Sequence, residues 1–199
     1  VGPDVAAAAI GFMGPEQVHR EWLGRRADLS AHDAAMAYAG AAADWGRRIL
    51  DGYPASELAE LDQLCTRVID GAAPSVGALF AAWRALPLPD DHAGAVTVRL
   101  NVLRELRGCA HLSAVHAVGL GPLGAIMSTD DPIRGGSSWA ATFGWVEPYP
   151  PADGGARQRA EELTDTICCA PYSVLTPDEG ARFTHLVNEV RAAIEPDGG

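Results

Sequence analysis

The stretch from Val96 to Met127, VTVRLNVLRELRGCAHLSAVHAVGLGPLGAIM, constrains the fold most strongly. Its pattern predicts one long, mostly apolar helix with two arginines and a histidine in its middle. Residues 119–122, with two glycines and a proline, end this helix, and a short apolar segment continues to Met127. A helix that is apolar around most of its circumference is typical of a protein interior. Charge is costly to bury, and this helix would bury Arg104, Arg107 and His111. These residues therefore need partners or a functional role. We therefore expect this helix at the centre of the molecule.

Helical signals also dominate the rest of the chain, and no alternating apolar pattern indicates a strand. Ser30 precedes an alanine-rich helix over residues 31–50 and is a suitable N-cap. Thr176, Pro177 and Glu179 form a capping box with proline at the first helical position. We predict an all-α protein, a single-domain helical bundle of about six to eight helices around the long central helix.

The pattern divides the chain into three segments. Residues 1–127 contain the N-terminal helices and the central helix, residues 128–155 form a loop rich in glycine, proline and aromatic residues, and residues 156–199 return to helices on the same core. The loop contains Trp139 and Trp145, and aromatic rings are costly to leave in water. We therefore expect the loop to lie on the surface of the helices, in a position to form a lid.

Charge and hydropathy argue against two classes of partner. The formal net charge is −11, and all 15 basic residues are arginines. A DNA-binding surface must neutralise phosphates, but the arginines stand in short runs interleaved with acidic residues, so we predict no nucleic-acid partner. No apolar run approaches the roughly 20 residues that cross a bilayer, so we predict no membrane partner.

The four cysteines and six histidines form no metal-binding pattern. No two cysteines have CxxC spacing. His111 and His116 are five residues apart, so they do not share a helical face. We predict no metal site, and the sequence identifies no cofactor. Free thiols are typical of a reducing compartment, so we expect a cytoplasmic protein.

One face of the predicted central helix combines charge with apolar surface. Arg104, Arg107 and His111 fall within about 60° of one another. Such a group could bind a carboxylate or phosphate while its apolar neighbours hold a carbon skeleton. His111 is therefore the candidate catalytic residue, and the two arginines are candidate ligand-binding residues. The alternative is structural, with the arginines paired to acids on neighbouring helices and the histidine packed in the core.

Two blocks of sequence resemble an actinobacterial SalK-like family of unassigned function, often labelled helix-turn-helix or MarR-like. The first block is WRALPLPDD at 83–91 followed by VLRELRGCAHLSAVHAVGL at 102–120, and the second is EELTDTICCAPYSVL at 161–175. The positions that match the family are Leu103, Arg104, Glu105, Arg107, Gly108, His111, Thr164, Asp165 and Pro171.

The resemblance has two implications. The family has a winged-helix-like segment between the two blocks, whereas this chain has only residues 128–155 there, so the wing is shortened. The match also carries Arg104 and Asp165 together, which makes Asp165 the first choice as the acidic partner of Arg104 and as a further ligand-binding residue. We expect Arg104 and His111 to be buried and to point towards a cavity that Trp139 and Trp145 cover.

These features favour a protein that binds a small, anionic or aromatic molecule in an interhelical pocket, with an enzyme of specialised metabolism as one form of that activity. A MarR-like transcriptional regulator is one alternative, and it requires a basic helix that fits a DNA groove. A structural or interaction protein without a ligand is another. The sequence leaves open which ligand binds, whether a reaction follows, and whether the chain forms a homodimer.

Overall fold

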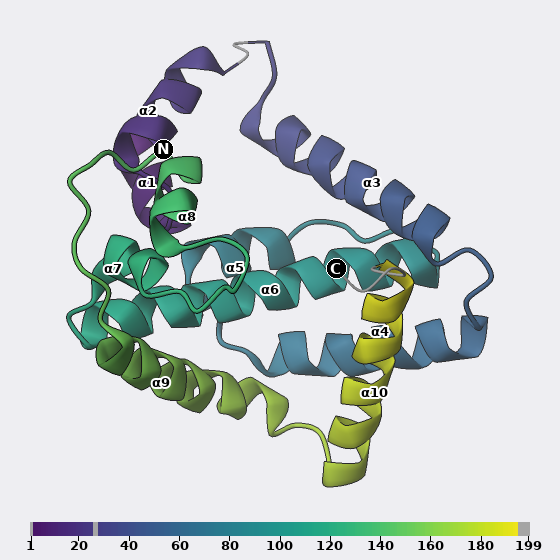
Figure 1. Ribbon diagram of the computed structural model, residues 1–199. Coiled ribbons are helices and arrows are strands. Elements are labelled where there is room, and N and C mark those ends of the chain that lie inside the picture. Colours follow the sequence, from purple (N-terminus) through teal and green to yellow (C-terminus); the bar gives the residue numbers. More distant parts are fainter. Residues whose placement is uncertain (1, 26–27, 195–199) are drawn as a thin grey trace. The chain divides into compact units, whose positions relative to one another are not determined.

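The protein is described here by a computed structural model, and the described residues are 2–25 and 28–194. This part of the chain contains ten α-helices, one short 3-10 helix (Pro74–Val76) and no strand (Figure 1). The predicted all-α, single-domain fold is confirmed, with more helices than expected. Within it the chain forms two compact units, which are described separately below.

The first unit consists of the described residues of Val1–Asp28, Gly77–Leu79 and Arg107–Cys168. In this unit α1 packs on α2, and α7 packs on α8. Its helices are α1 (Pro3–Ile10), α2 (Pro15–Gly24), α7 (Gly121–Met127), α8 (Gly136–Thr142), the C-terminal part of α6 (His92–Ala117) and most of α9 (Gly154–Tyr172).

The core of the first unit lies where α6, α7 and α9 meet. Val115, Ala125 and Ala160 are buried there, one from each helix. The turn between α1 and α2 closes on this core at Gly11, which has a φ of 71°. A Cβ at Gly11 would lie 2.5 Å from the Leu112 side chain, so both the backbone conformation and the available space favour glycine.

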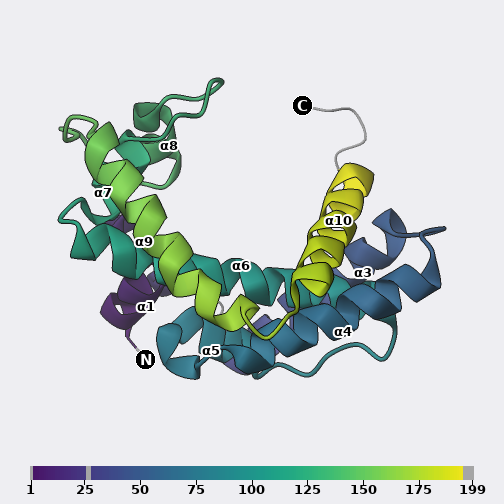
Figure 2. The ribbon, with the colours of Figure 1, turned by 90° about the horizontal axis from the view of Figure 1, so that it is seen from below.

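The second unit consists of the described residues of Leu29–Val76, Phe80–Leu106 and Cys169–Gly199. In this unit α10 packs on α4 (Figure 2), and Arg182 of α10 donates to Glu57 and Glu60 of α4. Its helices are α3 (Ala31–Ile49), α4 (Ala55–Gly71), most of α5 (Ala78–Arg84), the N-terminal part of α6 and α10 (Pro177–Ile194).

Helix ends in the second unit follow local sequence. The Ser30 side chain accepts a hydrogen bond from the Asp33 amide at 3.0 Å, which confirms the predicted cap of α3. Thr176 and Glu179 exchange the two hydrogen bonds of the predicted capping box at the start of α10. Asp91 caps α6 by accepting from the Gly94 amide at 2.8 Å.

The long apolar stretch is broken after Ala117. Gly119 and Gly121 have φ values of 76° and 69°, a conformation that other residues avoid, and the chain turns there from α6 into α7. In the described part of the chain no single helix is long and apolar enough to cross a membrane. Taken together, α6 and α7 are long and apolar enough, but the chain bends by 101° between them.

The prediction that residues 128–155 form only a loop is wrong for residues 136–142, which form α8. Glycine and serine make this segment a poor helix by propensity. Tertiary contacts stabilise it instead. Ala140 is fully buried, and the Trp139 indole donates to the Asp131 carboxylate at 2.9 Å.

Candidate ligand-binding site

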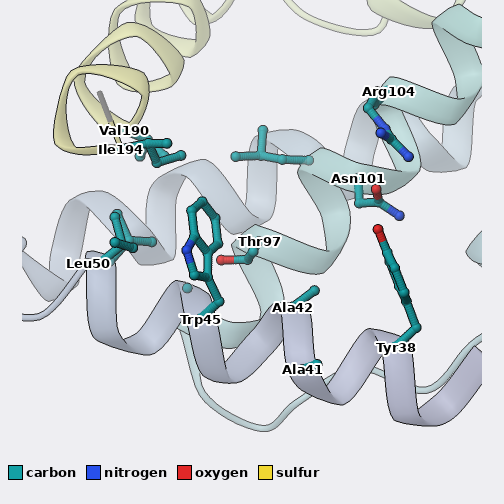
Figure 3. Close-up of a pocket in the computed structure, with 13 residues that line it drawn as sticks. Tyr38, Ala41, Ala42, Trp45, Leu50, Thr97, Asn101, Arg104, Val190 and Ile194 are labelled. Carbon is teal, nitrogen blue, oxygen red and sulfur yellow. The ribbon is translucent and has the colours of Figure 1, made fainter. Parts of the chain in front are cut away.

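The second unit contains an open-sided pocket of about 580 Å³ between α3, α6 and α10 (Figure 3). Small-molecule sites in proteins commonly have volumes of about 300–1,000 Å³, so this pocket has a suitable size. Its main lining residues are Tyr38, Trp45 and Ile49 of α3, Thr97, Leu100, Asn101 and Arg104 of α6, and Val190 and Ile194 of α10.

The sequence of α3 explains how the pocket forms. At Gly46 the helix lies directly against α6, because a Cβ there would fall 1.9 Å from Thr97 Oγ1 and 2.7 Å from Thr97 Cβ. The larger Tyr38 and Trp45 occur two turns apart on the same side of α3. Their side chains line the pocket next to this close contact (Figure 3).

The walls expose large aromatic surfaces. Tyr38 is 57% exposed and Trp45 is 38% exposed, although both lie in a concave region. The Tyr38 ring is held edge-on against Trp83, with ring centroids 5.3 Å apart. This contact restrains the Tyr38 ring, so a planar molecule that packs on its exposed surface orders little more of the side chain.

Few polar atoms face the pocket. The Thr97 hydroxyl donates to the Ala93 carbonyl at 2.9 Å, so its hydrogen is already used. Asn101 Nδ2 is buried and has no hydrogen-bond partner among the described residues. In Figure 3 the Tyr38 hydroxyl points towards the Asn101 amide. Because Nδ2 is covered in this structure, a ligand oxygen can reach this unpaired donor only when the Asn101 amide or the Tyr38 side chain turns.

The structure corrects the prediction for Arg104. Its side chain is 68% exposed, and Nη2 donates to Glu105 Oε1 at 2.5 Å, so neither the burial nor the pairing with Asp165 is correct. A long arginine side chain can reach solvent from a helix that is otherwise packed. The pocket that Arg104 lines is built from α3, α6 and α10 rather than from residues 128–155.

His111 belongs to the first unit, and its side chain is only 12% exposed, as predicted. Its Nδ1 lies 2.9 Å from Thr164 Oγ1. The single Thr164 hydroxyl hydrogen is donated to the Ala160 carbonyl at 2.7 Å, so Thr164 must accept from His111 Nδ1–H. The imidazole ring also stacks on Phe12, with centroids 5.6 Å apart. These contacts account for a neutral, packed histidine.

Burial lowers the pKa of His111 below its usual value of 6.5. The nearby Glu161 opposes this change, while Arg107 and Arg157 add to it. Glu161 accepts from Arg107 at 2.7 Å and from Arg157 at 3.0 Å, so its charge is already compensated. Arg107 thus pairs with an acid on a neighbouring helix, as the structural alternative expects. Catalysis by His111 stays a prediction.

Of the two predicted tryptophans, Trp145 contacts a residue that itself contacts His111. The Trp145 indole donates to the Phe12 carbonyl at 2.8 Å, and the Phe12 ring stacks on His111. Trp139 instead bonds Asp131, and the Arg134 guanidinium lies 4.1 Å from its ring centroid. The structure therefore connects Trp145, but not Trp139, to the histidine through Phe12.

Asp165, the remaining predicted ligand-binding residue, is exposed on α9. Its neighbour Thr164 is the residue that contacts His111. Sequence reasoning also did not select Tyr38, Trp45 and Asn101. Two signals were present: an aromatic pair seven residues apart on an alanine-rich helix, and an amide on the apolar central helix.

Across residues 2–25 and 28–194, no three side chains of His, Cys, Asp or Glu gather in a way that could hold a metal ion. The polar groups of the residues that line the pocket are an amide, two hydroxyls, an indole N–H and a guanidinium. Hydrogen bonding and charge attraction are therefore the chemistry that this pocket offers.

Comparison with known proteins relates the chain to a family. The sequence model of a helix-turn-helix family matches residues 1–152, which is more than half of the chain. Neither a curated protein nor a solved structure matches. The helix-turn-helix part of the resemblance is confirmed, while the SalK-like and MarR-like assignments stay predictions.

Proposed function

The chain belongs to this helix-turn-helix family, and we propose that it is a member that binds a small, largely apolar molecule between α3, α6 and α10. The pocket carries the proposal, because it is the right size and exposes Tyr38 and Trp45 in a concave surface. Covering aromatic surface removes it from water and stabilises the complex.

The proposal concerns binding rather than turnover. His111 belongs to the first unit, whereas every residue that lines the pocket belongs to the second. The hydrogen bond of His111 to Thr164 and its stacking on Phe12 support a packing role.

Titration with the fluorescent apolar probe N-phenyl-1-naphthylamine tests this function. Ala42 lines the pocket, so Ala42→Phe should fill it and weaken probe binding by about tenfold or more. Ala37 is exposed on the same helix outside the lining, so Ala37→Phe is the matched control and should bind like the wild type. Absent probe binding, or equal binding by all three proteins, would contradict the proposal.

A transcriptional regulator is the second candidate, and the family match favours it. The two candidates are compatible, since a regulator can bind a small effector. The net charge of −11 argues against a strong DNA interaction. We therefore expect no specific duplex to be enriched from a random pool at about 150 mM salt. Enrichment of one sequence with sub-micromolar affinity would establish DNA binding.

A further inference from the structure

Building on the proposed function, we infer that the pocket selects a flat aromatic monocarboxylate. The inference concerns the ligand class and depends on the pocket being a binding site. Three features carry it: a buried unpaired donor, a cation at the same wall, and the spacing of two aromatic side chains.

The donor and the cation lie on one stripe of α6. Thr97, Asn101 and Arg104 are spaced i, i+4 and i+7, so they lie on the same face of the helix. All three line the pocket. Asn101 Nδ2 lacks a partner among the described residues, and a ligand oxygen would provide one. A carboxylate has two oxygens and can accept from Asn101 and Arg104 together.

The charge of the lining favours an anion over a cation. Arg104 is charged, and the lining contains no aspartate or glutamate. Glu105 holds the Arg104 guanidinium through Nη2, and an arginine has further N–H donors for a ligand. Because Glu105 offsets part of the charge and Arg104 is largely exposed, we expect Asn101 to contribute more to affinity than Arg104.

The apolar walls set the shape of the ligand body. Tyr38 and Trp45 are seven residues apart on α3, which corresponds to about 10 Å along the helix axis. Two fused aromatic rings fit this spacing. Val190 and Ile194 of α10 add aliphatic surface on another side of the pocket.

Displacement of N-phenyl-1-naphthylamine by three matched naphthalenes tests the ligand class. The competitors are 2-naphthoate, the neutral ketone 2-acetonaphthone, and 2-methylnaphthalene, which has no acceptor oxygen. In the wild type 2-naphthoate should displace the probe best and 2-methylnaphthalene worst, with about a tenfold or greater range.

Two variants assign this preference to residues. Asn101→Leu should weaken both oxygen-bearing competitors by about tenfold and leave 2-methylnaphthalene unchanged. Arg104→Met should weaken 2-naphthoate alone, by about threefold. Arg48→Met, which removes an exposed arginine outside the lining, is the matched charge control. Should Asn101→Leu not fold, Asn101→Asp replaces it, and its carboxylate should repel 2-naphthoate.

The outcomes distinguish an error in the ligand class from an error in the binding function. If the probe binds and Ala42→Phe prevents binding, but the three competitors are equal or Asn101 substitution has no effect, the ligand class is wrong and the binding function stands. If the probe does not bind, the function itself fails. If sedimentation shows a wild-type dimer that Ala42→Phe dissociates, a second copy covers the pocket and both are overturned.

Discussion

Replacing Thr164 with valine tests whether a hydrogen bond, rather than a catalytic role, explains His111. Thr164 is fully buried, accepts from His111 Nδ1 and donates to the Ala160 carbonyl. Valine has nearly the same shape but no hydroxyl, so Thr164→Val leaves the imidazole N–H buried and unpaired. An unsatisfied buried donor costs about 1–3 kcal/mol. We expect the free energy of unfolding to fall by that amount.

A double-mutant cycle isolates this bond from general packing. His111→Phe keeps a ring against Phe12 and leaves Thr164 bonded to Ala160, so the variant should lose less stability than Thr164→Val. The double variant has no unpaired N–H. Its loss should therefore be smaller than the sum of the single losses by about 1–2 kcal/mol.

Urea unfolding followed by circular dichroism, near neutral pH, measures all four proteins. Additive losses, within about 0.5 kcal/mol, would refute the reasoning. In that case the Thr164 hydroxyl would not stabilise the position of His111, and the catalytic interpretation of the histidine would regain support.

Three further predictions concern pH, packing and thiol reactivity. Since burial lowers the pKa of His111, the unfolded state binds a proton more readily than the folded state. The stability of the wild type relative to His111→Phe should thus fall as pH drops below about 6.5, and a relative rise in urea titrations would contradict this. Gly46→Ala should lower the free energy of unfolding by about 1–3 kcal/mol and weaken probe binding, because its Cβ would collide with Thr97 Cβ; unchanged melting and binding would disprove the close contact. Burial raises the pKa of the Cys65 thiol to about 12, so a thiol reagent should modify exposed Cys169 in the native protein and leave Cys65 intact by peptide mass mapping. Equal labelling of both would show that Cys65 is accessible.

Local features of the fold were predictable from the sequence, since they depend on neighbouring residues. Ser30 caps α3 because its hydroxyl reaches an amide three residues away. Thr176 and Glu179 cap the start of α10 because each side chain reaches the backbone amide of the other, three residues away. The helix at 136–142 was not predictable in this way, because the buried Ala140 and the contact between Trp139 and Asp131 stabilise it.

The candidate site depends on contacts between distant segments. Periodicity places Arg104 on α6, but it does not tell whether the side chain reaches solvent or lies in the core. Tyr38, Asn101 and Val190 come from three helices, and only the packing of α3 and α10 on α6 brings them to one pocket. A pattern within one helix could therefore identify the residue types but not the site.

The amide signal of Asn101 provides the most direct test of the ligand site. The chain contains two asparagines and three glutamines, so a proton–nitrogen correlation spectrum shows few side-chain amides, and Asn101→Leu identifies the relevant pair. Titration with 2-naphthoate should shift this pair progressively and saturably, and should leave the Asn188 pair in place. An Asn101 signal that does not move at saturating 2-naphthoate would contradict the proposed contact.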